Sequence, residues 1–484
     1  MAEHNLARAA EDALERHGDF ESLYFEGAWH RSGELLERAR RLASGLRELG
    51  VTPGDRVVVF AANCPEVPVA YNAIWRAGAA VTPAIFLLPQ QELRHIVEDA
   101  DARAVIASPE FAATAREAAG DALVISTDEF ATLEQADASP IVDREPFDLA
   151  ALMYTGGTTG RAKGVMLTHE NLWQVGKAAE DAGHVPGIAR VLTALPLSHA
   201  FGLLVTVIGF HTREPTRSVL MRWFEPTEWL ELAQEHRVQI VAVVPSMLNL
   251  LLAQPLEDYD LSELRYVASG ASALTPELAA ELQRRLPDVE VREGYGLTET
   301  SGLVSTTPPG RVRPGSVGLP APGVEVRIEG DDEIGEICCR SPFVMAGYWR
   351  APETTAEALR DGWLYSGDLG RIDEDGYLYV VDRKKDLILR GGFNVFPRDV
   401  EDALLEHPAI DTAAVVGRPD EEHGEEVVAF VTLSEDVDPD DIVAWARTRI
   451  GGYKYPREVH VVAVLPLTPV GKVDRKALRA LVLA

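Results

Sequence analysis

A glycine- and threonine-rich segment is the first place in the sequence where residue types point to chemistry. Residues 154–164 read Tyr-Thr-Gly-Gly-Thr-Thr-Gly-Arg-Ala-Lys-Gly and follow an apolar run. Backbone N–H groups and hydroxyls of such a loop can donate to phosphate oxygens, and Lys163 adds a positive charge. A Walker A loop is excluded, because Arg161 and Ala162 separate Lys163 from the preceding glycine and Gly164 follows it. The segment therefore predicts a phosphate-binding loop of another type.

A second segment, Gly-Tyr-Gly-Leu-Thr-Glu-Thr at 294–300, places an aromatic ring between two glycines. Tyr295 could stack on a flat base, and the Glu299 carboxylate is a hard oxygen ligand suited to Mg²⁺. The segment is not a dinucleotide fingerprint, since Glu299 stands where the third glycine would be. Taken alone, the pattern also fits a tyrosine of the core.

Three later segments carry further polar groups. Asp368, within Tyr-Ser-Gly-Asp-Leu-Gly at 365–370, could accept hydrogen bonds from both hydroxyls of a ribose or be a solvated turn residue. A basic run at 383–385 precedes Arg-Gly-Gly-Phe-Asn at 390–394. Lys472 lies near the C-terminus on a loop that contains prolines and a glycine, Pro-Leu-Thr-Pro-Val-Gly-Lys.

The elements that position these segments alternate between helical and strand patterns over the first 310 residues or so. This alternation is typical of an α/β fold with mainly parallel strands, in which the loops at strand ends carry the chemistry. The predicted helices are 33–49, 66–76 and 229–236, with a buried helix within 201–210, and the predicted strands are 56–61, 79–84, 190–195, 239–244 and 264–269.

The pattern changes after about residue 310 to shorter strand-like runs with turn-rich joins. The runs 324–329, 335–339 and 376–381 indicate an antiparallel β subdomain. A helix at 397–405 and strands at 411–417 and 426–433 then indicate a small α+β domain. We therefore predict a large N-terminal domain at 1–383 and a small C-terminal domain at 384–484.

Composition excludes several classes of protein. Over 484 residues, 46 Lys and Arg stand against 76 Asp and Glu, a formal net charge of −30. Such a chain is repelled by nucleic-acid phosphates and by anionic membrane surfaces, so neither is an expected partner. The length exceeds what one hydrophobic core usually organises, about 250–300 residues, which agrees with two domains.

Three features of the sequence bear on localisation. The three cysteines show no CxxC spacing, which argues against a disulfide framework or a zinc site and favours the reducing cytoplasm. The N-terminal stretch is charged and unlike a secretory signal. The uncharged tract 191–212 is interrupted by Pro196, Ser198 and His199, so a buried loop and helix is favoured over a membrane span.

The order of the five polar segments resembles the adenylate-forming superfamily of acyl-CoA synthetases, luciferases and nonribosomal adenylation domains. The resemblance covers nearly the whole chain and includes softer matches at 54–57, 269–271 and 335–337. The phosphate loop has Gly156 where serine is commonest and Ala162 where proline is commonest. In these two positions it is similar to long-chain fatty acyl-CoA ligases.

This resemblance implies a two-step reaction. A carboxylate attacks the α-phosphorus of ATP to give acyl-AMP and pyrophosphate, and a thiol, usually that of coenzyme A, then displaces AMP. Cations and N–H donors must offset the repulsion between the carboxylate and the triphosphate in the first step. The C-terminal domain is implied to be mobile and to rotate between the steps, which would take the lysine near the C-terminus out of the site.

The resemblance also assigns roles residue by residue. It implies phosphate binding by Thr155, Gly156, Gly157, Thr158, Thr159, Gly160 and Lys163; magnesium binding by Glu299; adenine and acyl contacts by Gly270, Ala271, Ser272, Gly294, Tyr295, Gly296 and Thr298; ribose binding by Asp368 and Arg383; a pantetheine path along Gly391 and Gly392; a hinge at Lys385; a bridge from Lys472 to the carboxylate and α-phosphate; and an acyl-pocket gate at His199.

The substrate class follows less directly. The tract 191–212 lacks the aspartate with which amino-acid-activating relatives hold an ammonium group, and 294–307 contains no cation for a second carboxylate. We therefore expect an apolar fatty or aryl monocarboxylate, with room left by small residues such as Gly270 and Gly302. The expected enzyme is an ATP-, Mg²⁺- and coenzyme A-dependent ligase whose positive potential is confined to a cleft between its domains.

Alternatives remain at this level. The acyl group could pass to a carrier protein or to an amine instead of coenzyme A, and a homodimer is open. A luciferase-like oxygenase has only fold-level analogy behind it. A catalytically silent acyl-adenylate sensor is disfavoured because Lys163, Glu299, Asp368 and Lys472 are all intact.

Overall fold

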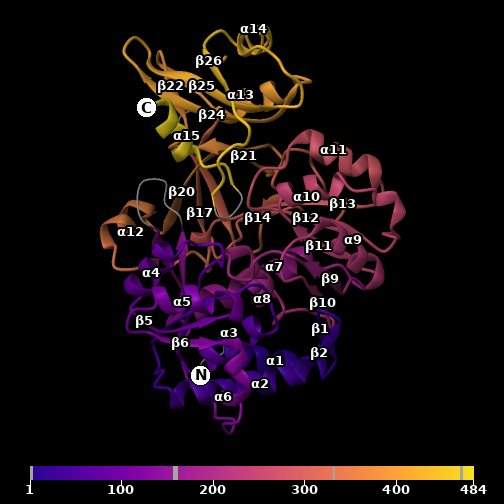
Figure 1. The fold of residues 1–484 in the computed structure, drawn as a ribbon, viewed down its shortest axis with the longest axis vertical. Helices are drawn as coiled ribbons and strands as arrows, with labels where there is room; N and C mark the ends of the chain where they lie inside the picture. Colours follow the sequence, from indigo (N-terminus) through magenta and orange to yellow (C-terminus); the bar gives the residue numbers. More distant parts are fainter. Residues whose placement is uncertain (1–3, 156–161, 331–332, 469–471, 484) are drawn as a thin grey trace. The chain divides into compact units, whose positions relative to one another are not determined.

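The computed structural model describes residues 4–155, 162–330, 333–468 and 472–483 (Figure 1). The chain divides into two compact units. The first unit comprises Met1–Val326 and Cys339–Leu364, and the second comprises Arg327–Cys338 and Tyr365–Ala484. The predicted α/β class with additional β structure is confirmed, while the predicted domain boundary between residues 383 and 384 stays a prediction.

The larger sheet of the first unit has nine strands in the order β15-β14-β13-β12-β11-β9-β10-β1-β2. The strands from β13 to β1 pair in parallel, and the outer pairings at both ends are antiparallel. The bounds are β1 (Glu21–Phe25), β2 (Ala28–Arg31), β9 (Arg190–Thr193), β10 (Arg217–Leu220), β11 (Ile240–Val243), β12 (Tyr266–Ser269), β13 (Glu290–Tyr295), β14 (Ser305–Thr306) and β15 (Leu319–Pro320).

The second sheet of this unit has seven strands in the order β18-β8-β7-β4-β3-β5-β6. Its strands are β3 (Arg56–Phe60), β4 (Ala80–Pro83), β5 (Ala102–Ala107), β6 (Leu123–Ser126), β7 (Leu149–Thr155), β8 (Lys163–Thr168) and β18 (Gly347–Tyr348). The continuous Val-Val-Val-Phe of β3 is buried along its length, as expected for a parallel strand covered on both faces. The β7–β8 pair is antiparallel and forms a hairpin.

Helices cover both sheets of the first unit. They are α1 (Leu6–His17), α2 (Ser32–Glu48), α3 (Glu66–Arg76), α4 (Gln90–Asp99), α5 (Ala112–Ala118), α6 (Phe130–Leu133), α7 (His169–Gly183), α8 (Ala200–Ile208), α9 (Pro226–Glu235), α10 (Pro245–Leu252), α11 (Pro276–Arg285) and α12 (Pro352–Ala358). The uncharged tract folds into α8, as predicted. No helix within the described residues is long and apolar enough to cross a membrane.

The two faces of the nine-stranded sheet differ in character. On one face, Leu192, Val241, Val267 and Val291 join one apolar core with buried side chains of α9, α10 and α11. Side chains alternate along a strand, so the residues next in sequence to these lie on the opposite face. The register pairs Thr193 with Ala242, Ala242 with Ala268, and Ala268 with Arg292, which places these four residues in one row across the sheet.

The β subdomain is a five-stranded sheet with the order β16-β17-β20-β19 and β21 paired with β20. Its strands are β16 (Glu325–Glu329), β17 (Gly335–Arg340), β19 (Leu359–Arg360), β20 (Trp363–Ile372) and β21 (Leu378–Arg383). The β19–β20 and β20–β21 pairs are antiparallel, as predicted. The β20–β21 register sets Asp368 directly opposite Arg383.

The C-terminal sheet has the order β23-β22-β25-β24, with β26 in parallel beside β25. Its elements are β22 (Ile388–Arg390), β23 (Phe393–Val395), α13 (Pro397–Leu405), β24 (Ile410–Asp420), β25 (Gly424–Leu433), α14 (Pro439–Arg449), β26 (Glu458–Val461) and α15 (Arg475–Val482). Helices α13 and α14 pack on one apolar cluster, through Val400 and Ile442, and α15 packs on another through Leu478. The predicted α+β character of this region is confirmed.

Candidate active site

The predicted phosphate loop connects the two strands of the β7–β8 hairpin. Thr155 is the last residue of β7, Lys163 is the first of β8, and the two residues pair in register. The predicted residues Gly156, Gly157, Thr158, Thr159 and Gly160 lie outside the described residues. The Lys163 side chain is exposed, and its Nζ lies 5.6 Å from the centre of the Tyr348 ring.

Glu299 lies near the same ring. It belongs to a single 3₁₀ turn, Thr298–Thr300, and its Oε1 accepts a hydrogen bond of 2.8 Å from the Tyr348 hydroxyl. Burial and the neighbouring carboxylate raise the pKa of Tyr348, so the hydroxyl remains a donor. Within the described part of the chain Oε2 of Glu299 has no hydrogen-bond partner, and the half-buried carboxylate thus fits a magnesium ligand.

Tyr348 was missed by sequence analysis, although it connects two predicted site residues. It lies on β18, which pairs with β8 opposite Val165. The available signal was the aromatic pair Tyr348-Trp349 after a glycine. Its meaning depends on a strand pairing between segments that are far apart in sequence.

The predicted adenine segment follows the carboxyl end of β13. Gly294 and Tyr295 end the strand, and a Cβ added at Gly296 would lie 2.2 Å from the carbonyl oxygen of Gly302, so only glycine fits there. Tyr295 and Thr298 are half-buried. The fold therefore presents this ring and the Glu299 turn at the same edge of the sheet.

The second predicted lining segment follows the neighbouring strand β12. Ala271 adopts φ +67°, a left-handed conformation that is uncommon for a residue other than glycine. Ser272 is exposed beside it. A Cβ built at Gly270 would lie 3.3 Å from the Gly294 carbonyl oxygen, so the loop after β12 closely approaches the end of β13.

His199 caps the helix that covers this edge. Its Nδ1 accepts a hydrogen bond of 3.3 Å from the backbone N–H of Phe201 at the start of α8. The Phe201 ring lies 3.5 Å from the position of a Cβ at Gly270. The structure therefore places Phe201, two residues after the predicted gate, against Gly270.

Arg292 is a second residue that sequence analysis missed. Only 7% of it is exposed, its Nε and Nη2 both lie 2.7 Å from Glu290 Oε2, and its guanidinium lies 3.8 Å from the centre of the Tyr266 ring. Nη1 is buried and has no partner among the described residues. The signal was a basic residue at an inward position of a strand, two residues before Gly294.

A cluster of charges lies in the second unit. Asp368, of which 4% is exposed, pairs with Arg383 at 3.2 Å from Nε to Oδ1. Although much of the Lys472 residue is exposed, loss of solvent around its ammonium lowers the pKa, Arg383 and Lys385 lower it further, and Asp368 opposes them. Desolvation and Arg383 lower the pKa of Lys385 in the same way.

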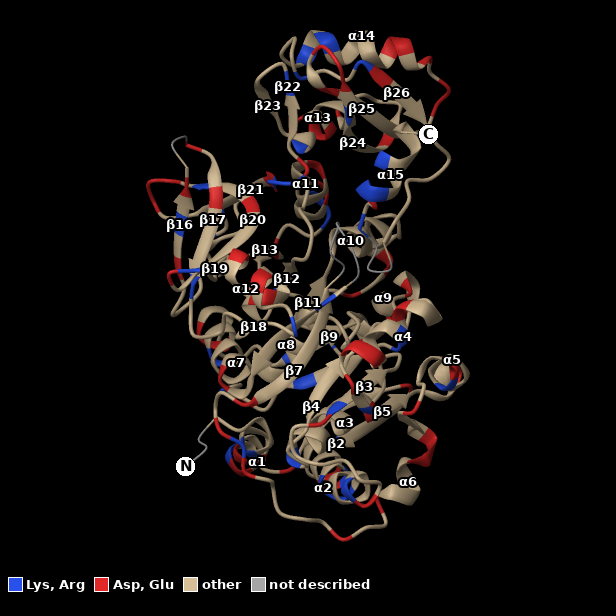
Figure 2. Cartoon of the chain, turned by 90° about the vertical axis from the view of Figure 1, so that its left-hand side faces the viewer, with Lys and Arg blue, Asp and Glu red and all other residues tan. Residues whose placement is uncertain are grey.

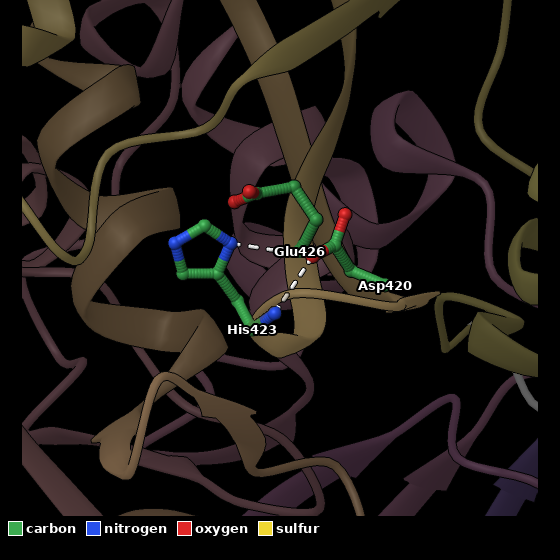
Figure 3. Close-up of side chains that lie close together, drawn as sticks. All are labelled: Asp420, His423 and Glu426. Carbon is green, nitrogen blue, oxygen red and sulfur yellow. Dashed lines mark hydrogen bonds and ion pairs between the residues drawn. The ribbon is translucent and has the colours of Figure 1, made fainter.

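Gly391 and Gly392 form the turn between β22 and β23, with φ of +57° and +83°. The Gly391 N–H donates 2.7 Å to the carbonyl of His423, and a Cβ at Gly391 would lie 3.6 Å from the His423 ring. Asp420, His423 and Glu426 lie close together here (Figure 3), with one ligand atom of each within 4.8 Å of the others. Glu426 already pairs with Arg390 at 2.6 Å. We therefore interpret the three side chains as a structural support of the β22–β23 hairpin and not as a metal site.

Comparison with known proteins identifies the family. The model of the AMP-binding enzyme family matches residues 10–349, and that of the AMP-binding enzyme C-terminal domain matches residues 399–472. The chain belongs to the AMP-binding enzyme family. This confirms the predicted membership of the adenylate-forming superfamily.

Named relatives extend over almost the full chain. A feruloyl-CoA synthase of an Amycolatopsis species is 38% identical, over 92% of this chain and 92% of the relative. A long-chain-fatty-acid–CoA ligase of Bacillus subtilis is 33% identical, over 96% of this chain and 92% of the relative. The solved structure of the amide bond synthetase McbA from Marinactinospora thermotolerans matches with a TM-score of 0.89 and 31% identity, over 98% of this chain and 99% of that one.

Proposed function

We propose that this AMP-forming acyl-CoA synthetase activates an apolar fatty or aryl monocarboxylate as its acyl-AMP and transfers the acyl group to coenzyme A. The reaction class is supported by the relatives that are named as CoA synthases or ligases. The observation that supports the nucleotide site is the contact of Tyr348 with both Lys163 and Glu299 beside the β7–β8 hairpin. One aromatic residue thereby holds a cation and a carboxylate at the edge where a triphosphate and its metal would bind.

The first step needs positive charge at the phosphates. In this proposal Lys163 and the backbone of the hairpin loop bind the β- and γ-phosphates, and Lys472 donates to the attacking carboxylate and the α-phosphate. Glu299 would hold Mg²⁺, which when bound neutralises phosphate charge as a hard cation. The Tyr348 hydroxyl fixes the Glu299 carboxylate for that purpose.

The nucleoside is assigned to the residues for which the family resemblance implies that role. Tyr295 would stack on adenine, with the main chain of Gly294, Gly296 and Thr298 around it, and Asp368 would bind the ribose. The ion pair with Arg383 orients the Asp368 carboxylate. No enzyme nucleophile is required, because the carboxylate and the thiol are both supplied by substrates.

The second step is assigned to the C-terminal region. We propose that Lys385 is the hinge, that Lys472 leaves after adenylation, and that Gly391 and Gly392 border the pantetheine path. Both glycines have left-handed backbone conformations that disfavour other residues. A homodimer and a carrier-protein acceptor remain further proposals.

The alternative acceptor of the acyl group is an amine. The structural similarity to an amide bond synthetase supports this alternative. Acid-dependent pyrophosphate release should first be screened with straight-chain and aryl acids. Mass spectrometry of products formed with coenzyme A, a carrier protein and simple amines then separates the acceptors. A coenzyme A thioester is expected, whereas an amide or carrier thioester alone would overturn the main proposal, and no pyrophosphate release with any acid would favour the silent sensor.

A further inference from the structure

We propose that the face of the nine-stranded sheet opposite its apolar core binds the body of the acid, and that Arg292 donates from Nη1 to a neutral oxygen at the acid's distal end. This inference rests on the proposed function and deepens it. The substrate class it assigns is a monocarboxylate, aryl in the simplest case, that carries a hydroxyl, ether or carbonyl oxygen remote from the carboxylate.

The row Thr193–Ala242–Ala268–Arg292 has an unusual distribution of polar atoms. Its two middle members are alanines, and each end carries a buried polar atom without a partner among the described residues, Thr193 Oγ1 and Arg292 Nη1. Only 4% of Thr193 and 7% of Arg292 are exposed. Buried donors without partners cost free energy, so a ligand that accepts a hydrogen bond here would remove that cost.

The row lies at the depth that a bound acid would reach. Gly270 and Gly294 lie two residues beyond Ala268 and Arg292 on the same face, about 7 Å further toward the carboxyl ends of the strands at the usual rise per residue. The Phe201 ring of α8 approaches Gly270 from this face. An acid with its carboxylate beyond the two glycines would therefore extend under α8 past Ala268. The Arg292 guanidinium lies further along this direction, because it contacts Glu290 and the Tyr266 ring.

The pairing of Arg292 decides the kind of group it can bind. Glu290 already neutralises the guanidinium through Nε and Nη2, while Tyr266 covers one face of it. A carboxylate at Nη1 would leave an uncompensated negative charge in a buried site, which is costly. A neutral oxygen satisfies the donor without adding charge, and an alkyl end would leave it unsatisfied.

The test compares three acids of one shape: cinnamate, 4-methoxycinnamate and 4-carboxycinnamate. We expect kcat/KM for acid-dependent pyrophosphate release to be about ten- to hundred-fold higher for the methoxy acid than for cinnamate, the effect of one buried hydrogen bond. The dicarboxylate should be the poorest of the three. Equal values for the first two acids would overturn the inference, whereas no release with any acid would instead overturn the proposed function.

Variants locate the effect. The double variant Arg292→Met with Glu290→Gln removes the pair together and should bring the methoxy-to-cinnamate ratio close to one, while Arg292→Gln, which keeps an N–H donor, should retain part of it. Arg284→Gln, in an exposed pair with Glu281 on α11, is the matched control and should keep the wild-type ratio. A full ratio in the double variant would overturn the role of Arg292. If the double variant does not fold, the wild-type ratio and Arg292→Gln decide.

Discussion

Arg292 in the first unit and Lys472 in the second are held in opposite ways. Arg292 is buried beside Glu290, which neutralises its charge. The pKa of Lys472 is lowered by loss of solvent around its ammonium and then by Arg383 and Lys385, while the Asp368 carboxylate opposes them. The Arg292–Glu290 pair is electrically neutral and leaves the Nη1 donor without a partner among the described residues. The region around Lys472 instead concentrates positive charge.

The contrast follows from what each site would meet. A triphosphate brings several negative charges, so a cluster with excess positive charge lowers the repulsion of the attacking carboxylate. The distal end of an apolar acid brings none, so an uncompensated cation there would be costly to bury. In a chain of net charge −30, whose acidic and basic residues occur along most of the elements (Figure 2), such local arrangements matter more than the overall charge.

Removing the charge of Lys472 should have the largest effect. Lys472→Ala is expected to lower acid-dependent pyrophosphate release by about 10²–10³-fold, the usual cost of losing one transition-state donor. Thioester formation from supplied acyl-AMP should be nearly unaffected, because the lysine is assigned to the first step only. Both half-reactions are measured separately by product chromatography.

Lys177→Ala is the control for this experiment, since Lys177 is an exposed residue of α7 paired with Asp181. It should leave both half-reactions at the wild-type rate. An equal loss of both half-reactions in Lys472→Ala would contradict the division of labour between the two steps.

Removing the neutralising partner of Arg292 should make the first site resemble the second. Glu290→Gln leaves the guanidinium uncompensated, so the preference for 4-carboxycinnamate over 4-methoxycinnamate should rise about ten-fold, a change of about 1.4 kcal/mol. The amide oxygen of glutamine can still accept from the Gly310 N–H, now 3.1 Å from Glu290. Glu281→Gln on α11 is the matched control, and an unchanged preference in Glu290→Gln would contradict the neutral-pair explanation.

Thr193 tests the other unpartnered atom of the row. Thr193→Val keeps the shape and removes a buried hydroxyl that has no described partner, so the free energy of unfolding should rise by about 1 kcal/mol. The methoxy-to-cinnamate ratio should change by less than about two-fold, because the hydrogen bond to the distal oxygen of the acid is assigned to Arg292 and not to Thr193. Urea denaturation and the same kinetic assay measure the two effects. A ratio that collapses here would transfer the proposed role from Arg292 to Thr193.

Much of the fold could be predicted because its local signals are strong. The predicted helices 66–76 and 397–405 coincide with α3 and α13, each with regular apolar spacing, and α13 with proline at its first position. Strand ends were less accurate: the predicted 411–417 is β24, Ile410–Asp420, because a long hairpin with β25 continues the strand beyond its apolar residues.

The parts of the site that could not be predicted depend on contacts between distant segments. Tyr348 reaches Glu299 only because β18, on which it lies, pairs with β8. The Arg292 guanidinium lies over the ring of Tyr266, which belongs to the neighbouring parallel strand. The segment 294–307 contains no second cation, and Arg292 precedes it by two residues. Alternation along β13 places this arginine on the same face as Gly294, and the register of β12 and β13 sets it opposite Ala268.

A change of pH is the mildest way to distinguish the Lys472 site from the Arg292 site. Lys472 must be protonated to donate, and burial with Arg383 and Lys385 lowers its pKa, so adenylation should decline with rising pH before an ordinary lysine, with pKa about 10.4, would titrate. The methoxy-to-cinnamate ratio should remain constant while the rate falls, because a guanidinium side chain is not deprotonated in proteins. Lys472→Arg, which cannot lose its proton in this range, should abolish the decline in whatever activity it retains. A ratio that falls together with the rate would show that the two sites titrate as one and would contradict the contrast between them.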